Sequence, residues 1–308
     1  MSSDIILRTT DLSKRYKKRW AVSNLNISVR KGEVFGFLGP NGAGKSTTIR
    51  MLFSLVKPTS GGFELFGRSM KRCGKSVYSK TGSLIETPSF YNYLTAERNL
   101  DILGKLNGKI NRDRIYEVLE IVKLRDRAGD KVKSFSHGMK QRLGIAQALL
   151  SMPELIILDE PTTGLDPEGM KEIRELILSL SSDFNMTIFL SSHLLHEIEQ
   201  VCTNMAIIDE GKLKVQGKVH ELIKDTEFFV TEIQTNDAQK AEALLKNERW
   251  VKDITVTGDT IKVRLLAKDR HLIADKLVGN GLKVSAIIPR ASLEDYYLSL
   301  VQRNENGK

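Results

Sequence analysis

The chain has 308 residues, enough for two domains at ~100–200 residues each. Hydrophobic residues make up 41% and charged residues 28%, so the composition excludes a wholly disordered protein. With 23 Gly and 7 Pro, the chain is also neither collagen-like nor of low complexity. The formal net charge of +9 leaves nucleic-acid binding open. We expect no specific nucleic-acid partner, because the basic residues are spread out and the densest run, residues 14–19, suits a solvated hairpin.

No apolar run approaches the ~20 residues that a membrane helix needs. Residues 1–4 show no basic segment leading into an apolar one, so we expect no signal peptide. Cys73 and Cys202 form neither a CxxC pair nor a zinc pattern, which fits a reducing compartment. These features predict a cytoplasmic protein.

The first part of the chain alternates between short strands and one helix. Period-two alternation predicts strands over residues 5–10 and 21–29, and an apolar run predicts another over 33–38. Helical periodicity follows from 45 to about 55, and Pro58 with Gly61-Gly62 is expected to break the chain. Residues 92–151 are mostly helical, with helix caps expected at Thr95, Asn111 and Ser136.

Strands and helices then alternate, which predicts an α/β fold with a mostly parallel sheet into which 92–151 is inserted as a helical subdomain. Its strands are expected at 155–158, 187–190 and 206–208, with helices at 168–180 and 193–201. Beyond residue 220 the pattern predicts a small α+β domain of order βαββαβ, closed by a helix at 292–301 and a disordered tail. The expected domains are therefore 1–219 and 220–308. The six elements of the βαββαβ order are expected at 228–233, 239–246, 250–257, 260–266, 269–278 and 283–288.

Residues 39–46, Gly-Pro-Asn-Gly-Ala-Gly-Lys-Ser, match the pattern GxxxxGK[ST] between a predicted strand and a predicted helix. Glycines let backbone N–H groups surround a phosphate, and the helix N-terminus adds partial positive charge. In this pattern Lys45 reaches the β- and γ-phosphates and Ser46 ligates Mg²⁺. The residues expected to bind the nucleotide here are Gly39, Pro40, Asn41, Gly42, Ala43, Gly44, Lys45, Ser46 and Thr47.

Two carboxylates end the predicted strand at 155–158, where ligands bind in open α/β sheets. Asp159 is the expected partner of Mg²⁺, and Glu160 is placed to polarise an attacking water as a general base. His193 follows the next strand at the same edge. A neutral imidazole there can hydrogen-bond the γ-phosphate or the water, so His193 is the second catalytic candidate.

Together these segments resemble the nucleotide-binding subunit of ATP-binding cassette (ABC) transporters over residues 5 to about 218. Residues 136–142, Ser-His-Gly-Met-Lys-Gln-Arg, resemble the signature motif, with Ser136 and Gly138 retained. Residues 161–166 resemble the loop whose aspartate, here Asp166, crosses a dimer interface. His193 resembles the switch histidine, and Tyr16 stands where an aromatic ring stacks on adenine.

The resemblance implies a P-loop NTPase fold of the ABC ATPase type, with antiparallel N-terminal strands beside the parallel sheet. It also implies ATP and Mg²⁺ as cofactors and a head-to-tail dimer in which one signature motif contacts the γ-phosphate held by the other subunit. A homodimer is the simplest arrangement, because this chain carries one copy of each motif. ATP would close the dimer and hydrolysis would open it. This motion would drive an integral membrane permease from the inner face of the cell membrane.

Two departures from the family pattern narrow the resemblance. His137-Gly138-Met139 replaces the usual Gly-Gly-Gln, and Glu86 aligns with a glutamine that ligates Mg²⁺. With residues 94–100 and 291–297, these variants resemble the ATPases of bacitracin-resistance and lantibiotic-immunity exporters. The expected function is thus an export ATPase for peptide antibiotics. The alternative is a soluble ABC ATPase that acts on ribosomes or nucleic acid without a permease.

Two other questions stay open at this stage. The C-terminal segment is either a packing or dimer-stabilising module or a ligand sensor, and it shows no ligand signature. Phe90, Tyr91 and Tyr93 either pack in the core or form a groove that receives a permease helix.

Overall fold

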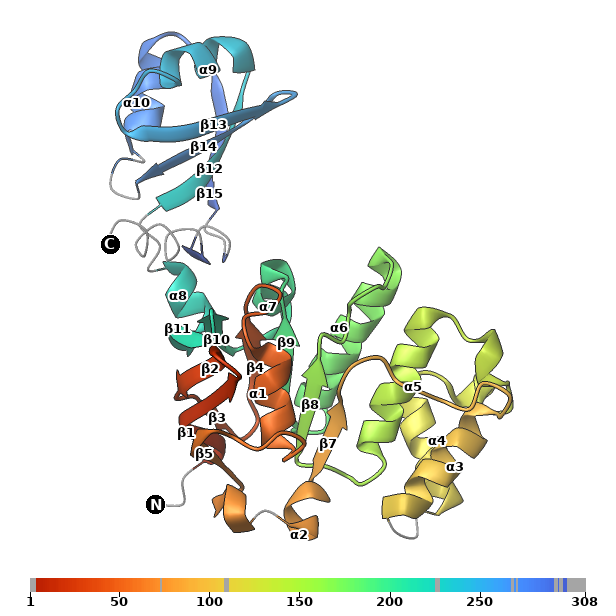
Figure 1. Ribbon diagram of the computed structural model, residues 1–308. Coiled ribbons are helices and arrows are strands. Elements are labelled where there is room, and N and C mark those ends of the chain that lie inside the picture. The colour runs from red at the N-terminus through yellow and green to blue at the C-terminus, as the bar shows by residue number, and fades with distance from the viewer. Residues whose placement is uncertain are drawn as a thin grey trace. The chain divides into compact units, whose positions relative to one another are not determined.

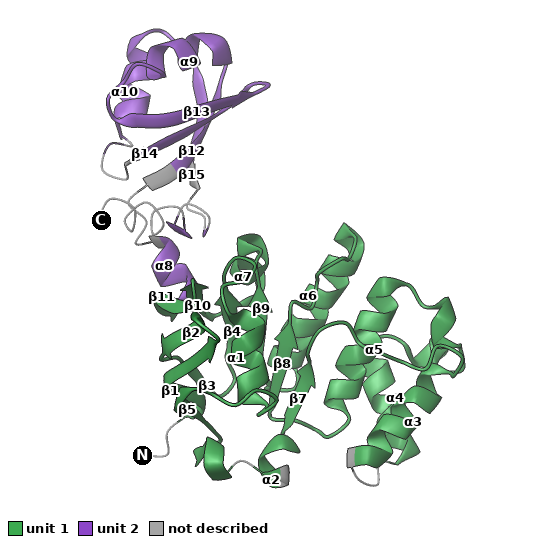
Figure 2. Cartoon of the chain, viewed as in Figure 1, with its two compact units in different colours: residues 1–217 green, residues 218–308 purple. Residues whose placement is uncertain are grey.

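The computed structural model describes residues 4–72, 74–107, 111–224, 228–266, 269, 271–290, 293 and 296–297. The chain divides into two compact units, residues 1–217 and 218–308, whereas the sequence pattern placed the division at 219/220 (Figure 2). Cys73, the tail and most of the predicted helix at 292–301 lie outside the described residues.

The first unit begins with an antiparallel sheet of order β2-β1-β5-β6, with β3 also paired to β1. The predicted strand at 5–10 is confirmed as the start of a longer β1, whereas the strand predicted at 21–29 is divided between β2 and β3. The predicted break at Gly61-Gly62 is wrong, because both residues lie in β5. At Gly61 the φ angle is +69°, and a Cβ atom would lie 2.1 Å from the carbonyl oxygen of Asp11, so glycine permits a bulge against β1. The strands are β1 (Ile5–Tyr16), β2 (Arg19–Leu25), β3 (Ser28–Arg30), β5 (Ser60–Leu65) and β6 (Arg68–Ser69).

A second sheet of order β11-β10-β4-β9-β8-β7 carries the parallel pairs and confirms the α/β prediction. Helix α1 (Lys45–Leu52) shares one hydrophobic core with strands of both sheets. At Gly36 of β4 a Cβ atom would lie 2.8 Å from Ile198 of α7 (Leu195–Val201), which shows how closely that helix packs. The strands are β4 (Val34–Leu38), β7 (Thr81–Leu84), β8 (Leu155–Asp159), β9 (Thr187–Ser192), β10 (Asn204–Asp209) and β11 (Lys212–Lys218).

The helical subdomain lies beside β7, the edge strand of the parallel sheet (Figure 1). It contains α3 (Ala96–Asn107), α4 (Arg112–Ile121) and α5 (His137–Leu149), and α5 packs on β7. The predicted caps are confirmed: the side chains of Thr95, Asn111 and Ser136 accept hydrogen bonds from the backbone of the first helical turn. Two further helices are α2 (Lys75–Tyr78) and α6 (Pro167–Ser182).

The second unit has the predicted βαββαβ order, preceded by α8 (Val219–Lys224). Its sheet order is β13-β14-β12-β15, and α9 and α10 bury residues such as Ala241 and Leu277 in the same core as Ile261 and Val263. The elements are β12 (Phe228–Thr235), α9 (Ala238–Leu245), β13 (Val251–Thr257), β14 (Thr260–Leu266), α10 (His271–Gly279) and β15 (Val284–Arg290).

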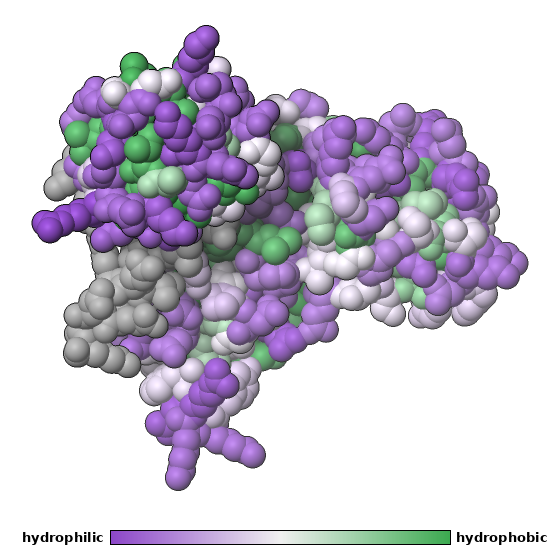
Figure 3. All heavy atoms as spheres, turned by 90° about the horizontal axis from the view of Figure 1, so that it is seen from above, coloured by the Kyte–Doolittle hydropathy of each residue, from purple (hydrophilic) through white to green (hydrophobic). Residues whose placement is uncertain are grey.

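In the described ranges, none of the helices combines the length and apolar character that crossing a bilayer requires. The face in Figure 3 is mainly hydrophilic, with apolar side chains scattered among polar ones.

Candidate functional site

The phosphate loop connects β4 to α1, as predicted, and α1 begins at Lys45. Gly44 precedes the helix with a φ angle of +108°, and a Cβ atom there would lie 2.4 Å from the carbonyl oxygen of Ala21. Only glycine fits this position without a backbone shift. The loop thereby brings its backbone to the N-terminus of α1, which is suited to hold an anion.

Strand register places the predicted catalytic residues at the same edge of the sheet as this loop. Leu38 pairs with Ser192, and Asp159 pairs with Ser191. The ends of β4, β8 and β9 are therefore level. The backbone N–H of Gly39 donates to the carbonyl of Ser192 at 3.2 Å, which joins the phosphate loop directly to the segment that precedes His193.

Glu160 lies at the centre of a small polar cluster. Its Oε1 atom is 3.1 Å from Nζ of Lys45, and its Oε2 atom is 3.0 Å from Nδ1 of His193. The hydroxyl of Thr163 also donates to Oε2, at 2.9 Å. Lys45 in turn donates to the carbonyl of Gly39 at 2.7 Å. The structure thus brings the two catalytic candidates together, with Glu160 in direct contact with the lysine of the phosphate loop.

Opposing effects act on the ionisation of Glu160. Burial raises the pKa of this carboxyl, but hydrogen bonds from Lys45 and Thr163 and the nearby positive charge outweigh that effect and lower it below its usual range. The side chain is 23% exposed. Glu160 is therefore an ionised carboxylate near neutral pH, paired with the ammonium group of Lys45.

Asp159 is buried at the end of β8, and its Oδ1 atom accepts a hydrogen bond from Ser191 at 2.5 Å. Ser46 lies in the first turn of α1, which packs on β8. Among the described residues there is no cluster of three or more His, Cys, Asp or Glu that could hold a metal by itself. One hydroxyl and one carboxylate fit a Mg²⁺ ion that takes its remaining oxygen ligands from nucleotide phosphates and water.

Glu86 adopts a left-handed conformation with a φ angle of +64° in the segment after β7. Its carboxylate forms an ion pair with Arg50 of α1, and its side chain is 62% exposed. Glu86 was expected to ligate Mg²⁺, but its carboxylate is paired with Arg50, which sequence analysis did not single out.

The two segments expected at a dimer interface, residues 136–142 and 161–166, lie close together in the folded chain. Ser136 caps α5, and Asp166 caps α6 by accepting from the N–H of Gly169 at 3.0 Å. A Cβ atom on Gly138 would lie 3.9 Å from the side chain of Leu165. The side chains of Ser136 and Asp166 thus each form a hydrogen bond within their own helix. The structure also leaves room for a Cβ atom at Gly138.

Tyr16 ends β1 at the tip of the predicted hairpin, directly opposite Arg19. Its ring is 46% exposed, and Nζ of Lys14 lies 5.1 Å from the ring centroid. Trp20 offers a second exposed ring nearby in sequence, with the guanidinium of Arg15 5.5 Å from its centroid. Sequence analysis missed Trp20, Thr163 and Ser191 as residues of the site. The sequence pointed to Thr163 and Ser191 only through their closeness in sequence to Glu160 and His193.

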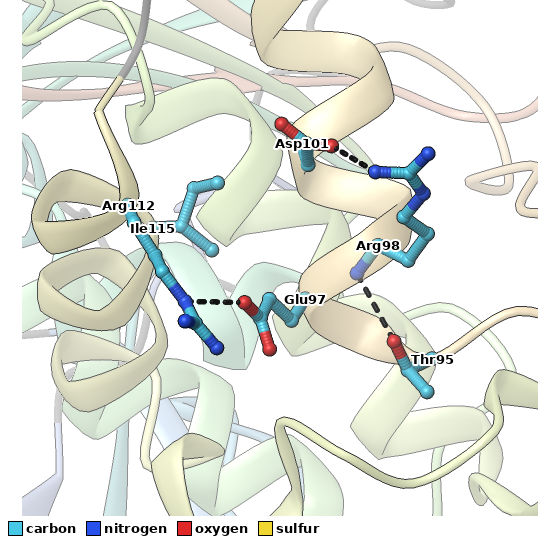
Figure 4. Close-up of a pocket in the computed structure, with 6 residues that line it drawn as sticks. All are labelled: Thr95, Glu97, Arg98, Asp101, Arg112 and Ile115. Atoms are coloured by element: carbon cyan, nitrogen blue, oxygen red, sulfur yellow. Dashed lines mark hydrogen bonds and ion pairs between the residues drawn. The ribbon is translucent and has the colours of Figure 1, made fainter.

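A separate pocket of about 330 Å³ lies between α3 and α4 (Figure 4). Its charged side chains are already paired: Glu97 with Arg112, and Asp101 with Arg98. None of its lining residues belongs to the predicted nucleotide site, so this solvated pocket is distinct from the chemistry described above.

Comparisons with known proteins identify the family to which the chain belongs. The ABC transporter family model matches residues 22–163. The bacitracin transport ATP-binding protein BcrA of Bacillus licheniformis is 46% identical and covers 96% of this chain and 97% of its own length. The BcrA protein of Enterococcus faecalis is 39% identical, with 98% of each chain covered.

Among solved structures, the dimeric ATP-binding cassette MJ0796 in a post-hydrolysis state with ADP and phosphate is 25% identical, with a TM-score of 0.62. The match covers 69% of this chain and 98% of that one. These findings confirm the predicted resemblance, fold class and ATPase activity. The chain therefore belongs to the ABC transporter family, as an ATP-hydrolysing, ATP-binding subunit.

Proposed function

We propose that this chain is the ATPase subunit of a bacterial exporter and that it uses Glu160 as its general base. The contact of Glu160 with both Lys45 and His193, at the edge that carries the phosphate loop, is the observation that carries the proposal. These are the groups needed to hold a γ-phosphate and to activate water beside it.

In this mechanism an incoming nucleotide exchanges the partner of Lys45. The ammonium moves from Glu160 to the β- and γ-phosphates, which carry more negative charge than one carboxylate. Glu160, once released, accepts a proton from the attacking water, while His193 fixes the water or the γ-phosphate. Mg²⁺ held by Ser46 and Asp159 would neutralise charge on the same phosphates. Adenine would stack on Tyr16.

The working unit is proposed to be a homodimer. The surroundings of Gly138 support this, because a Cβ atom there would come no closer than 3.9 Å to the described atoms beyond its chain neighbours and its own helix backbone. If a small residue is required at position 138, that requirement then comes from a second molecule. The γ-phosphate and the backbone of a second copy, facing Ser136 at the N-terminus of α5, would supply it.

A permease is the proposed membrane partner, and a groove in the first unit is the proposed contact. This groove of about 410 Å³ lies between the α2–β7 segment and helices α3 and α5. Its apolar lining includes Phe53, Tyr78, Leu103 and Leu106, of which Leu106 is 76% exposed. Strand β7 leads from the groove to Glu86, so a cytoplasmic helix of the permease seated there would touch the segment next to the nucleotide. The chain would then sit on the inner face of the cell membrane.

Tyr91 and Tyr93 extend this proposal. They are 51% and 67% exposed, and their ring centroids are 6.0 Å apart. The buried Asn99 holds their loop by hydrogen bonds to the backbone of Tyr91. Alanine at both tyrosines should leave ATP hydrolysis intact and weaken coupling to transport. Unchanged transport would instead favour the alternative, in which Tyr91 and Tyr93 only pack against their own chain.

The proposed cargo is a peptide antibiotic, as the names of the bacitracin transport relatives suggest. The experiment that tests the function is a pull-down of tagged Glu160→Gln protein from gently solubilised membranes with Mg-ATP. A polytopic membrane protein in stoichiometric amount is the expected result. Ribosomal proteins or nucleic acid without a membrane partner would instead favour the soluble alternative.

A further inference from the structure

Arg142 lies on α5, the helix that begins after Ser136, and its side chain is 13% exposed. Its Nη1 atom donates to the carbonyls of Val122 and Lys123, at 3.3 Å each. Its Nη2 atom lies 3.5 Å from Oε2 of Glu172 on α6. One guanidinium therefore joins the end of α4 to both α5 and α6.

The chemistry of this contact requires an arginine. The carbonyls of Val122 and Lys123 directly follow α4, and the C-terminal end of a helix favours a cation. A planar guanidinium presents its donors in a rigid fork that can face these carbonyls and Glu172 at once, whereas an ammonium is a compact point charge without that geometry. The Nε atom of Arg142 is buried without a hydrogen-bond partner in the described part of the chain. Leaving that donor unsatisfied costs free energy, which points to a role beyond stability.

The position of Arg142 connects the two segments assigned to the dimer interface. At their starts, α5 and α6 already approach each other: a Cβ atom on Gly138 would lie 4.0 Å from the Cα atom of Gly169. The contact between Arg142 and Glu172 joins the same two helices further along their lengths. Two contacts at different points restrict rotation of one helix against the other, which a single contact cannot do.

We propose that Arg142 is a positioning residue that holds α5 and α6 in one fixed relation, so that Ser136 and Asp166 meet a second copy as a single rigid surface. This inference rests on the proposed homodimer. It assigns Arg142 no contact with nucleotide. Its loss should therefore weaken ATP-driven dimerisation without changing ATP binding by the phosphate loop of the same chain.

The chain offers a matched control in Arg114 on α4. Its side chain is 12% exposed, and it donates to the carbonyl of Leu149 at the end of α5 at 2.5 Å. The two arginines thus cap each other's helices with the same chemistry and similar burial. The ion pair of Arg114 goes to Glu117 on its own helix and makes no link to α6.

The experiment introduces Arg142→Ala, Arg142→Lys and Arg114→Ala into the hydrolysis-deficient Glu160→Gln chain. Sedimentation measures the monomer–dimer equilibrium with Mg-ATP, and a fluorescent ATP analogue measures nucleotide affinity of the monomer. We expect Arg142→Ala to weaken dimerisation by about tenfold or more. Nucleotide affinity should stay within about twofold, and Arg114→Ala should leave dimerisation within about twofold.

Arg142→Lys should restore dimerisation only in part, and full recovery would overturn the claim that the guanidinium fork is needed. Equal weakening by Arg142→Ala and Arg114→Ala would also overturn the inference, because it would reveal general damage to the helical subdomain. A parent Glu160→Gln chain that stays monomeric with ATP would instead refute the proposed homodimer itself.

Discussion

Lys45 and Glu160 form an ion pair in which Nζ lies 3.1 Å from Oε1, with the lysine side chain only 4% exposed. The group proposed to bind phosphate and the proposed general base are therefore each other's partners. In the proposed mechanism the pair opens when phosphate arrives, which would couple nucleotide binding to activation of Glu160. His193 keeps contact with the other oxygen of Glu160 and can hold the carboxylate in place meanwhile.

The Glu160→Gln variant should bind ATP but hydrolyse it at least about a hundredfold more slowly, because a general base contributes ~10²–10⁴-fold. Glutamine keeps the shape of the side chain but cannot take a proton. Phosphate release and ATP affinity, measured on the same preparation, check this. Hydrolysis at the rate of the unmodified chain would reject Glu160 as the base.

The Lys45→Ala variant should behave in the opposite way and lose ATP affinity itself. Removal of the ammonium leaves the γ-phosphate without its main cationic partner, and hydrolysis falls as a consequence. Equilibrium binding of ATP, compared between Lys45→Ala and the unmodified chain, measures the effect. Normal affinity in Lys45→Ala would show that the lysine serves only the ion pair with Glu160.

Thermal stability should report the ionisation of Glu160. Burial raises its pKa, but the hydrogen bonds from Lys45 and Thr163 and the nearby positive charge outweigh that effect, so the folded-state pKa lies below the usual range of a glutamate. A lowered pKa means that the ionised group stabilises the fold above its unfolded pKa and loses that effect as the pH falls through the folded value. Without nucleotide, the unmodified chain should melt a few degrees above Glu160→Gln at pH 7, at ~2–4 °C per kcal/mol.

This difference in Tm should shrink as the pH falls below the usual range of a glutamate carboxyl. Scanning calorimetry of both chains at several pH values checks it. A difference that stays constant down to strongly acidic pH would mean that the charge of Glu160 does not stabilise the fold.

The parts of the site that chemistry confines to few residue types were predictable from sequence. The phosphate loop needs glycines and a lysine at fixed spacing, and Gly44 occupies a position that a Cβ atom would clash with. The helix caps at Asn111 and Ser136 were also predictable, because only a few short polar side chains can accept hydrogen bonds from the free N–H groups at a helix start.

Contacts set by strand register were not predictable. The ion pair of Lys45 with Glu160 and the hydrogen bond from Ser191 to Asp159 join residues more than thirty positions apart. Only the level ends of β4, β8 and β9 bring them together. The bulge at Gly61 was missed likewise, since a glycine that ends a strand and one that bends it look alike in sequence.

Glu86 and Arg50 give a test of metal binding in which two variants should act in opposite directions. If Glu86 ligates Mg²⁺, Glu86→Gln should raise the Mg²⁺ concentration for half-maximal hydrolysis, because an amide binds the ion less well than a carboxylate. Arg50→Ala should lower that concentration, since it frees the carboxylate from its exposed ion pair. Titration of ATPase activity with Mg²⁺ measures both. Shifts in the same direction would exclude Glu86 as a ligand.

Gly138→Ala separates the fold of α5 from its proposed contact with a second copy. A Cβ atom at this position would come no closer than 3.9 Å to the described atoms beyond its chain neighbours and its own helix backbone. Alanine also favours a helix over glycine by about 1 kcal/mol, so Tm should stay equal or rise. ATP affinity of the monomer should not change either. In the Glu160→Gln background, however, the added methyl group should weaken ATP-driven dimerisation, because the γ-phosphate and the facing backbone would occupy that space.

Sedimentation with Mg-ATP and thermal melting of the same protein check both halves of this prediction. A more stable chain that dimerises less would be the signature of a glycine kept for an intermolecular contact. A chain that dimerises as well as its parent would remove Gly138 from the proposed interface. A chain that loses stability would show that α5 itself requires the glycine, although a Cβ atom there would make only ordinary van der Waals contacts.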